Sequence, residues 1–212
     1  RHAQVGRSAF WDGRNQRHHP DRRGGTVRVR ADGKQVGGTL QRGRSYAEAV
    51  GSMAHEYGHF LSLPDLYDLD YDLDPELGPI DDSGGIGYWG LMGHRNRGWD
   101  EAGGPNPFCA WSLGKLGWLG VDNRQLEILD DDLEGAVFAD VNAGGNVAVV
   151  VKNATSYLMV EHRSRSHSYY ERNLPTEGLL IWEVDDLGTN SEERRKRVDL
   201  VSADGLYFDA GF

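Results

Sequence analysis

The sequence predicts an α+β fold in which one long helix is followed by Gly- and Asp-rich loops and a β-rich C-terminal part. Three observations predict it. Residues 45–61 have a helical apolar period, and residues 65–104 are rich in glycine and aspartate. After residue 120, short apolar runs alternate with Gly, Asn and Asp, which is typical of strands and turns. A chain of 212 residues is long enough to bury a substantial core.

Composition excludes several classes of protein. The formal net charge of −10 argues against a nucleic-acid partner. No apolar run reaches the ~18 residues of a transmembrane helix, so we expect no membrane span. The single cysteine, Cys109, excludes an internal disulfide framework and a cysteine-based zinc ribbon. We expect a monomer.

The first elements are a loop, a hairpin and a helix. Residues 1–25 lack periodicity and are expected to form a loop or the frayed end of a missing subdomain. Residues 27–30 alternate and lead into a turn signal at residues 31–34, so an exposed hairpin or an edge strand is expected there. Residues 45–61 are expected to form a helix that Pro64 stops. Its apolar stripe is expected to pack inward and consists of Tyr46, Ala49, Val50, Met53, Tyr57 and Phe60.

Later elements are a short helix and five strands. Residues 107–116 are expected to form a helix with Pro107 at its start. Strands are expected at residues 136–139, 146–151, 157–162, 179–184 and 198–201.

A metal-binding pattern lies on the first helix. His55-Glu56-Tyr57-Gly58-His59 has the H-E-x-x-H spacing. Residues four apart on a helix share a face, so both imidazoles reach one ion. Glu56 projects beside that ion and is a suitable general base for a zinc-bound water. Asp65, just beyond the helix, offers a third oxygen ligand, and Met92 offers an apolar floor.

An ordered series of motifs resembles the immune inhibitor A family of secreted metallopeptidases, in the metzincin clan. The resemblance covers Ser45 to the end of the chain. It rests on residues 55–59, 63–68, 87–92, 107–119, 157–163, 174–175, 178–182 and 198–205.

The resemblance implies a metzincin-like zinc peptidase core that hydrolyses peptide bonds in extracellular proteins. His55, His59 and Asp65 correspond to zinc ligands, Glu56 to the general base, and Met92 to the methionine of the turn under the metal. It also implies secretion and structural calcium, for which the loop offers many carboxylates. They are Asp65, Asp68, Asp70, Asp72, Asp74, Glu76, Asp81 and Asp82.

The chain departs from the family pattern at two positions. Ser62 stands where metzincins have a glycine, and a left-handed backbone there costs a non-glycine residue roughly 1–2 kcal/mol. His94 stands where related clans have a tyrosine that steadies the oxyanion, which makes it a candidate stabiliser or an ordinary loop histidine. Glu76 and Asp81 remain alternatives to Asp65 as third ligand.

We divide the chain into three parts. Residues 1–44 are a partial N-terminal segment of the catalytic module, residues 45–120 hold the zinc-binding helix, loop and Met-turn, and residues 121–212 are β-rich. The N-terminal segment is short for a metzincin. The alternative function is therefore a non-catalytic, metal-stabilised binding module or a pseudoenzyme fragment of a larger peptidase.

Overall fold

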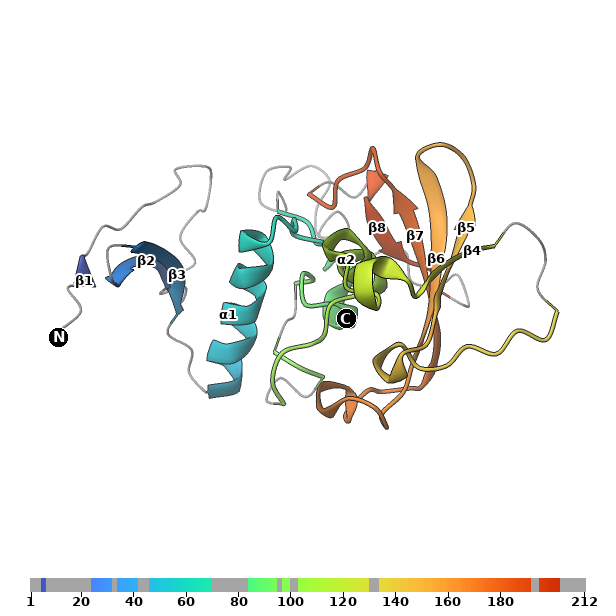
Figure 1. The fold of residues 1–212 in the computed structure, drawn as a ribbon, viewed down its shortest axis with the longest axis horizontal. Helices are drawn as coiled ribbons and strands as arrows, with labels where there is room; N and C mark the ends of the chain where they lie inside the picture. Colours follow the sequence, from blue (N-terminus) through green and yellow to red (C-terminus); the bar gives the residue numbers. More distant parts are fainter. Residues whose placement is uncertain are drawn as a thin grey trace, which may run out of the picture.

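The computed structural model describes residues 5–6, 24–31, 34–41, 46–69, 84–94, 97–99, 103–129, 134–191 and 195–202, with side chains from residue 49 onward. The fold is mixed α+β, as predicted (Figure 1). The helices are α1 (Tyr46–Phe60) and α2 (Ala110–Leu116), with short 3-10 helices η2 (Gly87–Trp89), η3 (Val121–Asn123), η4 (Val141–Ala143) and η5 (Tyr169–Glu171). The strands are β1 (Val5–Gly6), β2 (Gly24–Ala31), β3 (Lys34–Gln41), β4 (Leu126–Leu129), β5 (Val147–Val151), β6 (Ser156–Arg163), β7 (Gly178–Asp185) and β8 (Val198–Leu200).

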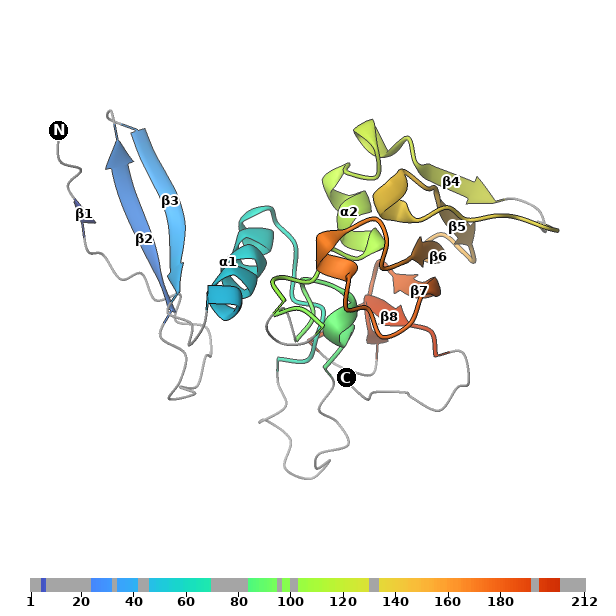
Figure 2. The same ribbon diagram turned by 90° about the horizontal axis from the view of Figure 1, so that it is seen from below.

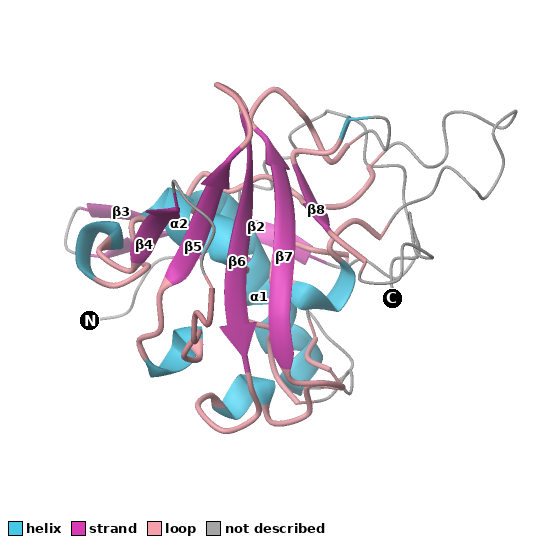
Figure 3. Cartoon of the chain, turned by 90° about the vertical axis from the view of Figure 1, so that its right-hand side faces the viewer, coloured by secondary structure: helices cyan, strands magenta, loops and turns pink. Residues whose placement is uncertain are grey.

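A five-stranded sheet dominates the C-terminal half. Its order is β4-β5-β6-β7-β8, and every neighbouring pair is antiparallel except β4 with β5. Figure 3 shows this sheet from one face, with α1 and α2 behind it. On the helix side Met159 lies opposite Trp182, and both are buried. The last four predicted strands are confirmed, with small differences at their ends.

The first predicted strand of this part is wrong. Residues 136–139 form no strand, and Val137 among them is 95% exposed. Asp140, which follows this segment, pairs with His162 in an isolated β-bridge rather than in a strand. The edge of the sheet is formed instead by β4, which the sequence patterns did not reveal and in which Leu126 pairs with Val147. A short apolar run forms a strand only where a partner strand is free to pair with it.

The predicted hairpin is confirmed. Ala31 pairs with Lys34, so the connection falls at Asp32-Gly33 as expected. The expectation of a loop throughout residues 1–25 is wrong at two places, because β1 pairs with β2 and β2 already begins at Gly24. Figures 1 and 2 place this hairpin on the side of α1 that faces away from the five-stranded sheet.

Helix α1 presents a different face to the core from the one predicted. Of the expected apolar stripe, Met53, Tyr57 and Phe60 are exposed, Phe60 by 72%. The buried positions are instead Gly51, Ser52, His55 and Gly58. At Gly58 the cause is the close approach of Met92: a β-carbon there would overlap Met92 Sδ, so no larger side chain would fit.

The C-terminal end of α1 and the N-terminal end of α2 also differ from expectation. Helix α1 ends at Phe60, four residues before Pro64, and Ser62 adopts a left-handed conformation with φ 70°. Helix α2 begins at Ala110, so Pro107 precedes its N-cap, Cys109, rather than starting the helix. Ser45, the first residue of the predicted helix, lies outside the described residues.

One hydrophobic core joins the α1–α2 region to the sheet. Its buried members run from Leu63, Leu66, Ile86, Met92, Cys109, Ala110, Trp111 and Leu119 to Val147, Met159, Trp182, Val184 and Val198. The two parts therefore share a single interior. In the part of the chain that the structure describes, no helix is long and apolar enough to cross a membrane.

Candidate metal centre

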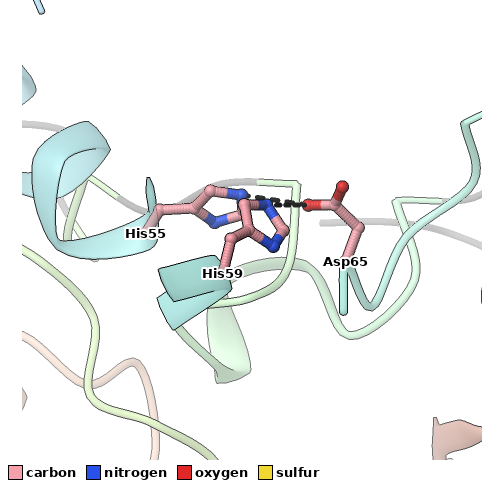
Figure 4. A group of neighbouring side chains, drawn as sticks. All are labelled: His55, His59 and Asp65. Carbon is pink, nitrogen blue, oxygen red and sulfur yellow. Dashed lines mark hydrogen bonds and ion pairs between the residues drawn. The ribbon is translucent and has the colours of Figure 1, made fainter. Parts of the chain in front are cut away.

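Three side chains converge beside the C-terminal end of α1 (Figure 4). The Oδ1 atom of Asp65 lies 3.0 Å from Nε2 of His55 and 3.2 Å from Nε2 of His59. The centroids of the two imidazole rings are 4.8 Å apart, and the ring planes are perpendicular. Within the described ranges, these residues form the one group of three His, Cys, Asp or Glu side chains with metal-ligand spacing. The structure thus brings together the three ligands proposed from the sequence.

Hydrogen bonds orient both imidazoles with Nε2 toward Asp65. Nδ1 of His55 lies 2.8 Å from the Leu91 carbonyl oxygen, and Nδ1 of His59 lies 2.9 Å from that of Leu63. A carbonyl only accepts, so each Nδ1 carries a proton and each neutral ring presents a lone pair at Nε2. Two such lone pairs and a carboxylate oxygen repel one another unless a proton or a cation lies among them.

The donor set fits a divalent transition metal ion. Two neutral imidazoles and one carboxylate are ligands that Zn²⁺ accepts, with room for water or substrate. The fixed tautomers are the arrangement in which histidines bind metal, because a second hydrogen bond holds each ring in place.

Electrostatics at the site agree with this geometry. The hydrogen bond with Asp65 raises the pKa of His59 from 6.5 to about 9, against the opposing effect of burial. Burial disfavours the Asp65 carboxylate, yet hydrogen bonds from His55 and His59 outweigh it and hold its pKa below the ordinary value. Without a metal, a proton therefore takes the place of the cation.

The turn that ends α1 positions His59. The Ser62 N–H donates to the His59 carbonyl and the Leu63 N–H to the Gly58 carbonyl, which together form a Schellman motif. This motif normally has glycine at the left-handed position, and here Ser62 occupies it. The turn brings the Leu63 carbonyl back to His59, so the departure from the family pattern at Ser62 falls in the turn that shapes the site.

A second turn, residues 88–92, contacts His55 and the segment that carries Asp65. Every carbonyl in it accepts a hydrogen bond. In chain order the donors are Asn106 Nδ2, Arg163 Nη1, Gly93 N, His55 Nδ1 and Leu66 N. The turn therefore binds His55 directly and holds the segment of Asp65 through Leu66. Met92 is fully buried and packs against Gly58 between the two histidines.

Glu56 and His94 lie on the solvent side. Glu56 is exposed on α1, and its negative charge contributes to the raised pKa of His59, so the carboxylate lies within electrostatic reach of the site. His94 is exposed, and its ring meets Tyr67 edge-on at 5.3 Å. Tyr67 in turn contacts the His55 ring at 6.3 Å, which places His94 one aromatic ring away from a proposed ligand.

Access to the centre is uneven. The His55 side chain is 6% exposed, that of Asp65 16%, and that of His59 33%. The centre is therefore open to solvent at His59.

Several proposed residues lie outside the described residues. These are the alternative third ligands Glu76 and Asp81 and the calcium candidates Asp70, Asp72, Asp74 and Asp82. Of the carboxylates proposed for calcium, Asp65 faces the histidines instead and Asp68 is buried. Calcium binding stays a prediction.

Sequence reasoning missed the groups that orient the histidines. Two of them, the carbonyls of Leu63 and Leu91, belong to the main chain and carry no side-chain signal. The donor to the neighbouring Trp89 carbonyl, Arg163, was missed as well, although the sequence offered a signal for it. Glu161 and Arg163 share a strand face with buried Met159, which is an unusual place for charged residues.

Two histidines and an aspartate around one point, beside a helix and above a methionine, define a metal site of the kind found in metallopeptidases. The chain belongs to the immune inhibitor A peptidase M6 family, whose catalytic-domain model matches residues 3–120, more than half of the chain. It is thus a peptidase-family protein, and the resemblance seen in the sequence motifs is confirmed. No curated protein and no solved structure matches the chain.

Proposed function

We propose that this chain is a zinc-dependent endopeptidase with a metzincin-like core, in which His55, His59 and Asp65 hold the metal. The observation that carries this proposal is the convergence of Asp65 Oδ1 on both Nε2 atoms, at 3.0 and 3.2 Å, with each Nδ1 facing a carbonyl. Met92 beneath the helix supports the metzincin-like arrangement. Membership of the peptidase family supports the reaction class.

The chemistry that zinc supplies when bound is that of a Lewis acid, which lowers the pKa of water and polarises a peptide carbonyl. The chain's own residues do the remaining work. Glu56, exposed and within electrostatic reach of His59, accepts a proton from the attacking water and passes it to the leaving amine. The solvent-open side at His59 admits the peptide, and the buried Leu91 carbonyl keeps His55 in its binding tautomer.

His94 is the proposed stabiliser of the oxyanion. Its exposure leaves the ring accessible to substrate, and its contact with Tyr67 ties it to the ring that lies beside His55. The proposed substrates are extracellular proteins, and secretion of the chain follows the character of the family that the motifs resemble.

Cleavage of casein, with zinc content measured in the same sample, tests the proposal. Glu56→Gln should retain one zinc and lose activity by about 10²–10⁴-fold, the usual contribution of a general base. Glu134→Gln, at another exposed carboxylate, should match the parent chain. Unchanged cleavage by Glu56→Gln with its zinc intact contradicts the proposed role of Glu56. A parent chain that binds zinc and cleaves nothing is the non-catalytic binding module instead.

A further inference from the structure

A buried ion pair links the C-terminal sheet to the turn under the metal centre. Arg163, at the end of β6, and Glu171, in η5, are almost completely buried and hydrogen-bonded to each other. The second Arg163 nitrogen, Nη1, donates to the Trp89 carbonyl at 2.7 Å. Glu171 also accepts a hydrogen bond from the Trp99 indole at 3.2 Å. One charged pair thus contacts two loops on the metal side of the molecule.

The turn needs such an anchor. Residues 88–92 form no strand and contain Gly90, with Gly87 and Gly93 on either side. Glycine-rich backbone has many conformations available, so its position is set by the donors around it. The Trp89 carbonyl has Arg163 as its donor, and the next anchored carbonyl, that of Leu91, orients His55.

The ion pair has little to gain from burial alone. Removing an arginine and a carboxylate from water is costly, and apolar residues of similar volume often stabilise a protein as well or better. What the guanidinium provides beyond packing is direction: its planar fork binds Glu171 and the Trp89 carbonyl at once.

We propose that Arg163 is a positioning residue of the metal centre: from β6 it fixes the Trp89 carbonyl, and through the turn it holds the Leu91 carbonyl against His55 and Met92 beneath the helix. This inference rests on the proposed metal centre. Arg163 lies beyond residue 120, where the match to the catalytic-domain family ends. The β-rich part then helps to position the metal ligands, in addition to packing against the α1–α2 region in one core.

The test compares two double variants of the full chain, in each of which one ion pair is replaced by two uncharged residues. R163M/E171Q removes the buried pair while leaving an amide oxygen for the Trp99 indole. K152M/E183Q removes an exposed pair on the same sheet, with a 2.6 Å contact, and serves as the matched control. Zinc affinity is measured by competition with a chelating dye, and the visible absorption of the cobalt-substituted protein reports ligand geometry. Cooperative thermal unfolding shows that each variant is folded.

R163M/E171Q should bind zinc about 10–100-fold more weakly and change the cobalt spectrum, as expected for loss of a group that orients metal ligands. K152M/E183Q should match the parent in both. If R163M/E171Q does not fold, R163K carries the test: it keeps a charge beside Glu171 but lacks the fork, and should weaken zinc binding by about 10-fold. A folded variant with the parent's zinc affinity and cobalt spectrum overturns the proposal. Both readouts are independent of peptide cleavage, so they remain decisive if the chain proves inactive as a peptidase.

Discussion

Gly58 and Met92 fit together because Gly58 has no side chain. A β-carbon at Gly58 would lie 2.3 Å from Met92 Sδ and 3.2 Å from Met92 Cε. Met92 therefore occupies the space that the side chain of any other residue at position 58 would fill. This close approach of Met92 and the hydrogen bond between His55 Nδ1 and the Leu91 carbonyl both hold the helix against the turn.

Gly58→Ala should consequently destabilise the chain, although alanine is the better helix former. Overpacking of a filled interior costs about 1–3 kcal/mol, and here the displaced group is Met92 under the metal centre. Urea unfolding measures the loss, and zinc affinity should fall with it. In the double variant G58A/M92A the clash is absent, so its destabilisation should be smaller than the sum of the two single effects. Strict additivity would show that the two residues do not compete for space.

Ser62→Gly should stabilise the chain. Ser62 holds φ at 70°, in the region where residues other than glycine carry a cost of about 1–2 kcal/mol. Glycine relieves that cost but loses more entropy on folding, so a net gain of about 1 kcal/mol is expected. Ser62→Ala keeps the β-carbon and should change the free energy of unfolding little, which makes it the matched control. Equal stability of the glycine and alanine variants would mean that the turn is unstrained.

The sequence predicted the metal group because its parts are local. His55 and His59 are four residues apart on a helix, so helix geometry brings the two imidazoles close. Asp65 follows only six residues after His59, just past the turn that ends the helix. The hairpin and the last four strands of the sheet also follow from local signals, namely a turn dipeptide and alternating apolar residues.

Other features depend on contacts that no local pattern encodes. Gly58 of α1 faces inward because Met92, more than thirty residues away, packs against it. The apolar period of Met53, Tyr57 and Phe60 therefore predicted the wrong buried face, and these three side chains are exposed. Arg163 meets Trp89 across 74 positions of sequence. The strand expected at residues 136–139 failed for a similar reason, since the partner edge was already taken by β4.

The stability of the metal-free chain should depend on pH through His59 and Asp65. Folding raises the pKa of His59 from 6.5 to about 9, so protonated His59 stabilises the fold fully below pH 6.5 and ceases to do so as the pH rises through about 9. Folding lowers the pKa of Asp65, so its contribution is present above the ordinary value of 3.8 and is lost as the pH falls below it.

Chelator-treated protein should accordingly resist urea better at about pH 6 than at about pH 9.5. Asp65→Asn removes the partner of His59 and should abolish that difference. Zinc competes with the proton on His59, so zinc affinity should increase as the pH rises toward about 9. A metal-free chain whose unfolding midpoint is the same at both pH values would exclude the ion pair.

The identity of the third ligand follows from a comparison of three alanine variants. Asp65 lies 3.0 and 3.2 Å from the two Nε2 atoms, so Asp65→Ala should reduce zinc affinity by more than the ~10–100-fold typical of residues that merely orient a ligand. Glu76→Ala and Asp81→Ala should leave it unchanged. The Leu63 and Leu91 carbonyls still orient the histidines in Asp65→Ala, so a weaker two-histidine site should persist. If Glu76→Ala or Asp81→Ala abolishes binding while Asp65→Ala spares it, the carboxylate ligand comes from farther along the chain.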